Sequence, residues 1–422
     1  MEETEGHVFR NARLLDGTGA KPIAQAWIQT KGNRIEAIET GDHPVPAGYK
    51  EIDLEGQTLM PGLIDLHVHV GHHRSEPDAM RYENFSEAKI SLLAARDVEI
   101  SLLGGVTTLR DLGARHGQST TIRDAVNTGI LPGSRVISAN ESITFTGGHA
   151  SYEADGIWAL RAAIRRQIRG GADVIKIGQS DDKTFPGFTQ SELDALCDEA
   201  HRLGRRIAVH IDREPGYGMA VMAGVDTVEH GFYPSDETLQ RMLEQGTYWV
   251  PTITINRGMR SDEHTPERYE SNLVNGYRRK GLSAHQAQKR AADMREAFEA
   301  FPECFAEGVK MGVKIVTGSD GPRAGKIPMD SLRNEVIKFV QWGMKPSQAI
   351  VAATSLAAEA LGMEDELGRI QKGYLADLIV LDGDPLRNIE HVDRVLLVMK
   401  DGCIYRNELE GKTEEGSLWL MP

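Results

Sequence analysis

Eight short apolar runs that alternate with amphipathic stretches constrain the fold of this chain more than any other feature. The runs are rich in Val, Ile and Leu, as buried parallel strands are. The intervals between them, such as residues 86–104 and 190–204, place apolar residues at the spacing typical of helices with one buried face. This alternation predicts an α/β fold, a (β/α)8 TIM barrel. The eight runs read LIDLHVH, GVTTLRDLG, SRVISAN, ADVIKIGQS, RIAVHIDR, DTVEHGF, YWVPTITI and VKIVTGSDG.

The two ends of the chain have a different pattern. Residues 7–58 and 373–406 hold short alternating runs separated by Gly, Asn and Asp, which predict antiparallel hairpins. Neither segment is long enough for a core of its own. We therefore expect residues 1–60 and 372–422 to pair into one small β-sandwich domain, and residues 61–371 to form the TIM barrel domain.

Charge and composition exclude several classes of protein. The 422 residues contain 48 Lys and Arg against 62 Asp and Glu, a formal charge of −14, which argues against a binder of nucleic acid or of an anionic membrane. Three cysteines are too few for a disulfide framework. No run approaches the ~20 apolar residues that span a bilayer. The first residues, MEETEGHVFR, are acidic, unlike a signal peptide. We expect a cytoplasmic protein.

One segment is longer than an ordinary strand-to-helix connection. Residues 257–305 are charged and predicted to be mostly helical. They are expected to form either a lid or the contact of a homo-oligomer, and amphipathic spacing does not distinguish the two.

Polar residues interrupt the apolar runs near their carboxyl ends, where the active sites of parallel barrels lie. Taken singly, a histidine in a strand is more often a hydrogen-bonded core residue than a metal ligand, and an aspartate at a strand end can cap the next helix. A lone buried lysine is costly unless it is paired or neutral. Six such groups at the ends of five runs instead predict a site for Zn²⁺ or a similar divalent cation. They are His67, His69, Lys176, His210, His230 and Asp320.

These motifs resemble the amidohydrolase superfamily in its binuclear branch. The likeness rests on PGLIDLHVH, on IKI with its lysine, on the two single histidines and on TGSDG, and it extends to GYLADLIVLDGDP near the C-terminus. The resemblance implies that Lys176 is an N6-carboxylysine, formed with CO2 or bicarbonate, whose carbamate bridges two metal ions. It also implies that His67, His69 and Asp320 hold the first ion, and that His210 and His230 hold the second.

A hydrolytic mechanism follows as a hypothesis. A hydroxide that bridges two cations is a nucleophile at neutral pH, because the cations lower its pKa. One cation would polarise the scissile carbonyl and stabilise the oxyanion. Asp320 is the expected catalytic residue, taking the proton of the hydroxide and passing it to the leaving nitrogen.

Further motifs indicate a substrate class. GVTTLRDLG, TGGHAS and AGVDTVEHGFY are similar to the group that contains prolidase, Xaa-Pro dipeptidase and imidazolonepropionase relatives. That resemblance implies that His149 and Tyr233 bind the free α-carboxylate of the substrate. The chain is thus expected to be a dipeptidase or carboxypeptidase, or a hydrolase of N-acyl amino acids. Residues 178–188, GQSDDKTFPGF, depart from the group's pattern and weaken a specificity for proline.

Three alternatives remain. The same scaffold also hydrolyses non-peptide amides, ureas, carbamates and lactones. A deaminase would carry a His-x-x-Glu motif at the fifth run, whereas His210 is followed by Ile211, Asp212 and Arg213. A non-catalytic scaffold protein should lack some of the six ligands, and this chain lacks none.

Asp65, two residues before His67, is expected to be structural or to orient that histidine.

Overall fold

The computed structural model describes residues 6–72, 85–148, 150–179, 187–211, 213–231, 233–254, 274–275, 278, 283–322 and 329–409. The chain divides into two compact units. Unit 1 comprises Met1–Asp111, Gln118–Ile137 and Val316–Pro422, and unit 2 comprises Leu112–Gly117 and Ser138–Ile315.

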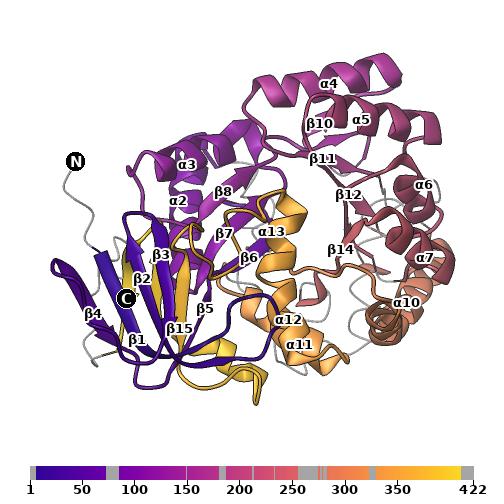
Figure 1. Cartoon of the computed structure of the whole chain (residues 1–422). Helices are drawn as coiled ribbons and strands as arrows, with labels where there is room; N and C mark the ends of the chain where they lie inside the picture. Colours follow the sequence, from indigo (N-terminus) through magenta and orange to yellow (C-terminus); the bar gives the residue numbers. More distant parts are fainter. Residues whose placement is uncertain are drawn as a thin grey trace. The chain divides into compact units, whose positions relative to one another are not determined.

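An eight-stranded sheet in unit 1 contains strands from both ends of the chain (Figure 1). Its order is β17-β16-β15-β5-β1-β2-β3, with β4 paired to β1. In the antiparallel pair β15–β5, Ile379 lies opposite Met60, so the N-terminal and C-terminal segments are directly hydrogen-bonded. The strands are β1 (Gly6–Leu14), β2 (Ile23–Lys31), β3 (Arg34–Thr40), β4 (Tyr49–Asp53), β5 (Thr58–Pro61), β15 (Leu378–Leu381), β16 (Val395–Lys400) and β17 (Cys403–Asn407).

The packing of this sheet explains why the two ends pair. Alternate residues of its strands form one apolar cluster, to which both ends of the chain contribute. Phe9, Ile28 and Leu59 come from the first 60 residues, and Leu378 and Leu397 come from the last 50. Neither set encloses this core alone.

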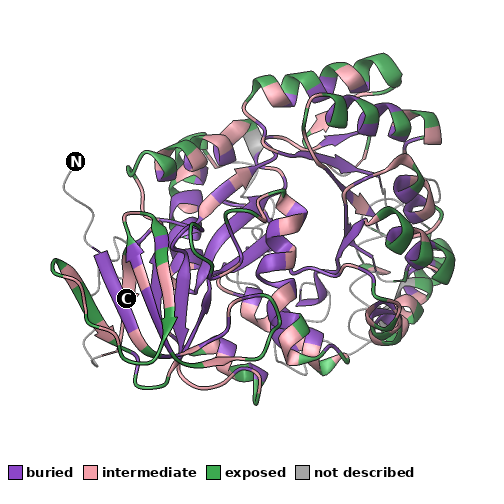
Figure 2. Ribbon diagram, in the orientation of Figure 1, coloured by how far each residue is buried: buried purple, intermediate pink, exposed green. Residues whose placement is uncertain are grey.

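A second, parallel sheet in unit 1 has the order β6-β7-β8. Every residue of β6 and β7 is buried, as expected for parallel strands covered on both faces (Figure 2). The strands are β6 (Leu63–Val68), β7 (Val106–Asp111) and β8 (Arg135–Ser138), and the helices of this unit are α2 (Glu87–Leu103), α3 (Gln118–Asn127), α11 (Leu332–Gln341), α12 (Pro346–Ala352) and α13 (Ser355–Leu361).

Unit 2 holds a six-stranded parallel sheet in the order β10-β9-β11-β12-β13-β14. Its strands are β9 (Ile143–Thr144), β10 (Tyr152–Glu153), β11 (Ile175–Gly178), β12 (Ile207–Ile211), β13 (Thr227–His230) and β14 (Tyr248–Val250). Its helices include α4 (Ile157–Arg169), α5 (Gln190–Arg202), α6 (Gly216–Ala223), α7 (Asp236–Gln245) and α10 (Ala284–Met311).

Local sequence fixes where these helices begin and end. Helix α5 starts at a capping box, in which the Thr189 side chain accepts from the backbone of Glu192 and the Glu192 side chain accepts from Thr189. Helices α7 and α10 end at Gly246 and Gly312, which adopt the left-handed conformation that favours glycine. The stretches 86–104 and 190–204 are helical as predicted, in α2 and α5.

Seven of the eight predicted runs contain a strand, and the eighth differs. Residues 313–321 form isolated bridges, from Ile315 to Trp249 in unit 2 and from Gly321 to Val68 in unit 1. The hydroxyl of Thr317 donates to the carbonyl of Ile64 (3.0 Å), and Asp320 has a left-handed φ of 53°. The φ of Asp320 departs from the extended geometry of a regular strand.

Part of the charged segment 257–305 lies outside the described residues. Residues 284–305 belong to α10, which confirms helix there, while a role as a lid or a subunit contact stays a prediction. None of the helices that the structure describes is long and apolar enough to cross a membrane.

Candidate metal centre

Three side chains of unit 1 converge at the end of β6. His67 lies in β6, His69 follows it, and Asp320 comes from the segment that pairs with β6. The Nε2 atoms of the two histidines are 3.3 Å apart, and Oδ1 of Asp320 lies 3.6 Å from His67 Nε2 and 3.4 Å from His69 Nε2. One ligand atom from each residue falls within 4.8 Å of the others, an arrangement that could hold a metal ion. Sequence reasoning had placed these three residues together.

Backbone geometry explains this convergence. His67 and His69 are two residues apart at the end of a strand, so they share a face. The Asp320 backbone N–H donates to the His67 carbonyl (2.7 Å), and the His69 N–H donates to the Gly321 carbonyl (2.8 Å). Asp320 therefore lies between two hydrogen bonds to the histidine segment. Its left-handed φ is uncommon for a residue other than glycine.

A buried carboxylate, Asp65, lies next to this cluster. It accepts hydrogen bonds from the backbone N–H of His67 (3.1 Å), the backbone N–H of Ser319 (3.0 Å) and the Ser319 hydroxyl (2.6 Å). Burial raises the pKa of the Asp65 carboxyl to about 7, and the hydrogen bonds from Ser319 and His67 oppose that rise. Asp65 thus joins the two segments that carry the candidate ligands, and whether its role is structural or orienting stays a prediction.

Two more carboxylates fix the backbone just after His69. Asp111, at the end of β7, accepts from the N–H of Val70 (2.8 Å). Asp97, on α2, accepts from the N–H of Gly71 (2.7 Å). Both side chains are buried, and their hydrogen bonds to the two backbone N–H groups hold this turn in place.

Unit 2 carries the other three predicted ligands on neighbouring strands. Lys176 in β11 is 4% exposed and lies between two buried isoleucines. Gly178 is paired with His210 of β12, so Lys176 and His210 share one face of the sheet. The rings of His210 and His230 have centroids 4.5 Å apart at an interplanar angle of 72°.

His230 reaches His210 because its backbone leaves the strand geometry. Strand register pairs Ile211, not His210, with His230, so strict alternation would place the two rings on opposite faces. His230 instead has a left-handed φ of 68°. Its Nδ1 lies 2.7 Å from the hydroxyl of Thr252, and the Trp249 indole donates to its carbonyl (2.6 Å). Sequence reasoning missed Thr252, although a polar residue near the end of the YWVPTITI run was a signal of the kind used for the others.

The two predicted substrate contacts are supported less directly. His149 lies outside the described residues. Tyr233 is 54% exposed and lines a groove of about 570 Å³ in unit 2. The same groove is lined by Asp236, Glu237 and Glu303, and such carboxylates disfavour a second anion there. Binding of an α-carboxylate by Tyr233 stays a prediction.

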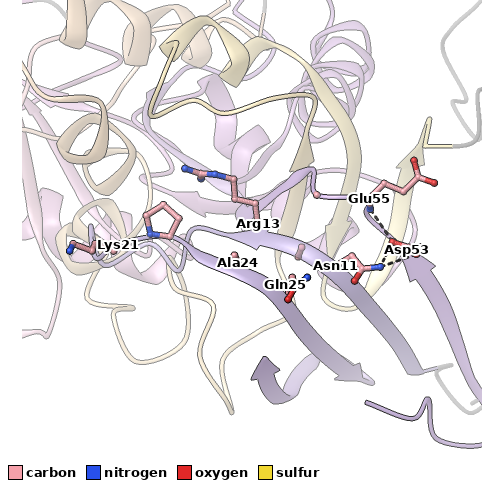
Figure 3. A pocket seen from close by; sticks show the side chains of 10 residues that line it. Asn11, Arg13, Lys21, Ala24, Gln25, Asp53 and Glu55 are labelled. Carbon is pink, nitrogen blue, oxygen red and sulfur yellow. Dashed lines mark hydrogen bonds between the residues drawn. The ribbon is translucent and has the colours of Figure 1, made fainter. Parts of the chain in front are cut away.

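Another groove, of about 760 Å³, lies on the eight-stranded sheet of unit 1 (Figure 3). Its polar groups bind one another: the Asn11 amide donates to both carboxylate oxygens of Asp53, and the Glu55 N–H donates to Asp53. Arg13 forms an ion pair with Asp384 (2.8 Å). Among the residues that the structure describes, the cluster with ligand atoms arranged for a metal is the one in unit 1 around His67.

Residues 58–404 match the amidohydrolase family. This match covers most of the chain and agrees with the histidine and aspartate cluster. The chain belongs to the amidohydrolase family.

Individual relatives cover nearly the whole length of the chain. Ochratoxinase from Aspergillus niger is 27% identical over 455 residues, covering 96% of this chain and 88% of that protein. Imidazolonepropionase from Rubrobacter xylanophilus is 23% identical, covering 89% of this chain and 90% of that protein. A solved structure of a Xaa-Pro dipeptidase with methionine bound in its active site is 29% identical, with a TM-score of 0.82, covering 95% of this chain and 99% of that chain.

These likenesses confirm the predicted family, its prolidase-like group and the fold class. This amidohydrolase has the α/β fold of a TIM barrel with a sheet domain built from both chain ends. The family and its hydrolase relatives support hydrolysis of amide bonds of a small molecule.

Proposed function

We propose that this amidohydrolase is a metal-dependent enzyme that cleaves the amide bond of a dipeptide or an N-acyl amino acid. The observation that carries the proposal is the cluster of His67, His69 and Asp320, whose ligand atoms lie within 4.8 Å of one another. Two imidazoles and a carboxylate are a donor set suited to Zn²⁺. The residues of unit 1 therefore fit a divalent cation.

The proposed second set of ligands lies in unit 2 and consists of Lys176, His210 and His230. A buried ammonium at Lys176 would be disfavoured by desolvation, whereas a carbamate formed with CO2 is an anion that can bind metal. The adjacent rings of His210 and His230 and the burial of Lys176 support this assignment. Two divalent ions per chain, most simply Zn²⁺, follow from the proposal.

When bound, such cations supply Lewis acidity, which polarises the scissile carbonyl and makes water a better nucleophile at neutral pH. The proposed role of Asp320 is to accept the proton of the attacking water and deliver it to the leaving nitrogen. The Asp320 N–H donates to the His67 carbonyl, and the Gly321 carbonyl accepts from the His69 N–H. These two bonds hold the Asp320 carboxylate beside the two histidines.

The substrate class is supported by the solved relatives and by the sequence motifs. A Xaa-Pro dipeptidase that resembles this chain over almost its whole length holds methionine in its active site. In our proposal His149 and Tyr233 contact the α-carboxylate of the substrate.

Amino-acid release from a mixed library of dipeptides and N-acyl amino acids tests the proposal. The protein would be supplied with Zn²⁺ and bicarbonate, and Lys176→Ala would be the paired variant. We expect release of one class of amino acid by the wild-type protein and a loss of at least 100-fold in the variant. Silence from a wild-type protein that holds two zinc ions would reject the peptidase assignment and direct the search to ureas, carbamates and lactones.

A further inference from the structure

One carboxylate and one hydroxyl connect the two segments that carry the metal-binding cluster of unit 1. Asp65 accepts the Ser319 hydroxyl through Oδ2 (2.6 Å), and it accepts the backbone N–H groups of Ser319 and His67 through Oδ1 (3.0 and 3.1 Å). The Ser319 oxygen in turn accepts the backbone N–H of Gly321 (3.2 Å). Both side chains are buried, so water does not compete for these bonds.

These bonds lie on both sides of a residue in an unfavourable conformation. Asp320 has a φ of 53°, which is strained for a residue with a side chain. On the N-terminal side of Asp320, the Ser319 N–H donates to Asp65. On the C-terminal side of Asp320, the Gly321 N–H donates to the Ser319 oxygen. Without these bonds Asp320 could relax toward an ordinary φ, and its carboxylate would move away from the histidines.

We propose that Ser319 and Asp65 are positioning residues that set the geometry in which His67, His69 and Asp320 bind a divalent cation. The inference rests on the proposed metal site and adds a residue, Ser319, whose own side chain is not a candidate ligand. Ser319 acts through hydrogen bonds alone: it donates its proton to Asp65 and accepts one from the backbone of Gly321.

A neighbouring residue offers a matched control. Thr317 lies in the same segment, is fully buried like Ser319, and also donates its hydroxyl to β6, at the carbonyl of Ile64 (3.0 Å). Thr317→Val removes that hydroxyl at nearly constant volume. Each substitution removes one buried hydrogen bond between the same two segments. Ser319→Ala also removes the acceptor of the Gly321 N–H, next to Asp320, whereas the second contact of the Thr317 hydroxyl is with the Ala352 carbonyl (3.4 Å).

Zinc affinity of the full-length chain tests the proposal. The dissociation constant would be measured by competition with a chromophoric chelator, for the site that disappears in His69→Ala. We expect Ser319→Ala to weaken zinc binding by about 10- to 100-fold, the range typical of groups that orient metal ligands. Thr317→Val should leave the zinc dissociation constant within about twofold of the wild-type value. Both variants should lower the melting temperature, because each loses a buried hydrogen bond. The visible spectrum of the Co²⁺-loaded protein should change in Ser319→Ala alone.

A double-variant cycle gives an independent check. Asp65→Asn should weaken zinc binding in the same direction, and Ser319→Ala combined with Asp65→Asn should lose little more than the worse single variant, because the two residues share one hydrogen bond. Losses that multiply, or an unchanged constant in Ser319→Ala, would overturn the inference while leaving the proposed function in place. A wild-type chain that binds no zinc would overturn the proposed function and this inference with it.

Discussion

Three residues at the ends of barrel-type strands share an unusual backbone conformation. Asp320, His230 and Thr252 have φ values of 53°, 68° and 45°, although none is glycine. A left-handed conformation costs such a residue about 1–2 kcal/mol. Each of the three residues makes a hydrogen bond that offsets the strain: the Asp320 N–H donates to the His67 carbonyl, and the Thr252 hydroxyl bonds to the His230 ring. In this conformation the Asp320 carboxylate lies beside His67 and His69, and the His230 ring lies beside His210.

The sequence could predict which residues are candidate ligands, but it could not predict these backbone conformations. The identity of His67, His69 and Asp320 follows from residue type and position at strand ends. The turn of His230 toward His210 does not follow, because it opposes the alternation on which strand reading relies. Ser319 and Thr252 were also not foreseen, since Ser and Thr are common in loops and their hydrogen bonds depend on tertiary contacts.

A buried carboxylate in unit 2, Glu199, makes the stability of the chain depend on pH. Glu199 has a side chain 1% exposed and binds Arg165 (2.6 Å), Arg202 (2.6 Å) and Arg161 (2.9 Å). The hydrogen bond from Arg165, with those from the other two arginines, lowers the pKa of Glu199 to about 2. Because the folded pKa lies below the unfolded value, the stability it contributes is full above the unfolded pKa of about 4.5 and is lost as the pH falls toward 2.

We expect Glu199→Gln to lower the free energy of unfolding by about 1–2 kcal/mol at pH 7, a figure reduced by the exposure of its arginine partners. Urea unfolding between pH 2 and 7 measures this difference, which should shrink below pH 4.5. The control is Asp198→Asn, whose carboxylate also binds Arg161 but is 60% exposed, and it should cost less than about 0.5 kcal/mol. A pH-independent difference for Glu199→Gln would contradict the ion-pair account.

Among the helices and strands, those with a clear apolar spacing in the sequence were predicted, and the shortest strands were not. Seven apolar runs contain strands, and both helical stretches singled out in the sequence are helices. Strands β9 and β10 have only two residues each, too few for any alternation to be visible. The eighth run forms isolated bridges at Ile315 and Gly321, and the left-handed φ of Asp320 departs from extended geometry just before Gly321.

The turn between β16 and β17 yields a prediction about one element. Gly402 has a φ of 75°, and a Cβ built there would lie 1.9 Å from the carbonyl oxygen of Gly32. Gly402→Ala should therefore destabilise the chain through both backbone strain and a clash with backbone. Gly41 is a matched control, with a φ of 88° and no atom within 4 Å of such a Cβ.

Chemical denaturation of the two alanine variants separates the two effects. Gly41→Ala should cost about 1 kcal/mol, the strain alone, and Gly402→Ala should cost at least about 1 kcal/mol more. Equal decreases in the free energy of unfolding for the two variants would show that the turn between β16 and β17 moves to admit the methyl group.

At the scale of the whole molecule, the sequence predicted the class of fold and the family because independent signals agreed. Strand and helix alternation indicated the barrel, the chain ends indicated a joint sheet, and the motifs indicated the family that residues 58–404 match. The substrate did not follow in the same way. The motifs that identify the family are shared by relatives that differ in substrate, ochratoxinase and a Xaa-Pro dipeptidase among them. The domain limits, the cytoplasmic location and a homo-oligomer stay predictions.

Removal and return of zinc tests the central claim most directly. Amide hydrolysis would be followed on one accepted N-acyl amino acid or dipeptide before chelation, after chelation and after Zn²⁺ and bicarbonate are returned. We expect activity to disappear with the metal and to return with it, along with a rise in melting temperature from ligand-linked stability. Asp320→Asn, assayed at a zinc concentration that fills its site, should turn over at least about 100-fold more slowly. Full activity in the chelated protein, or in Asp320→Asn, would contradict the account.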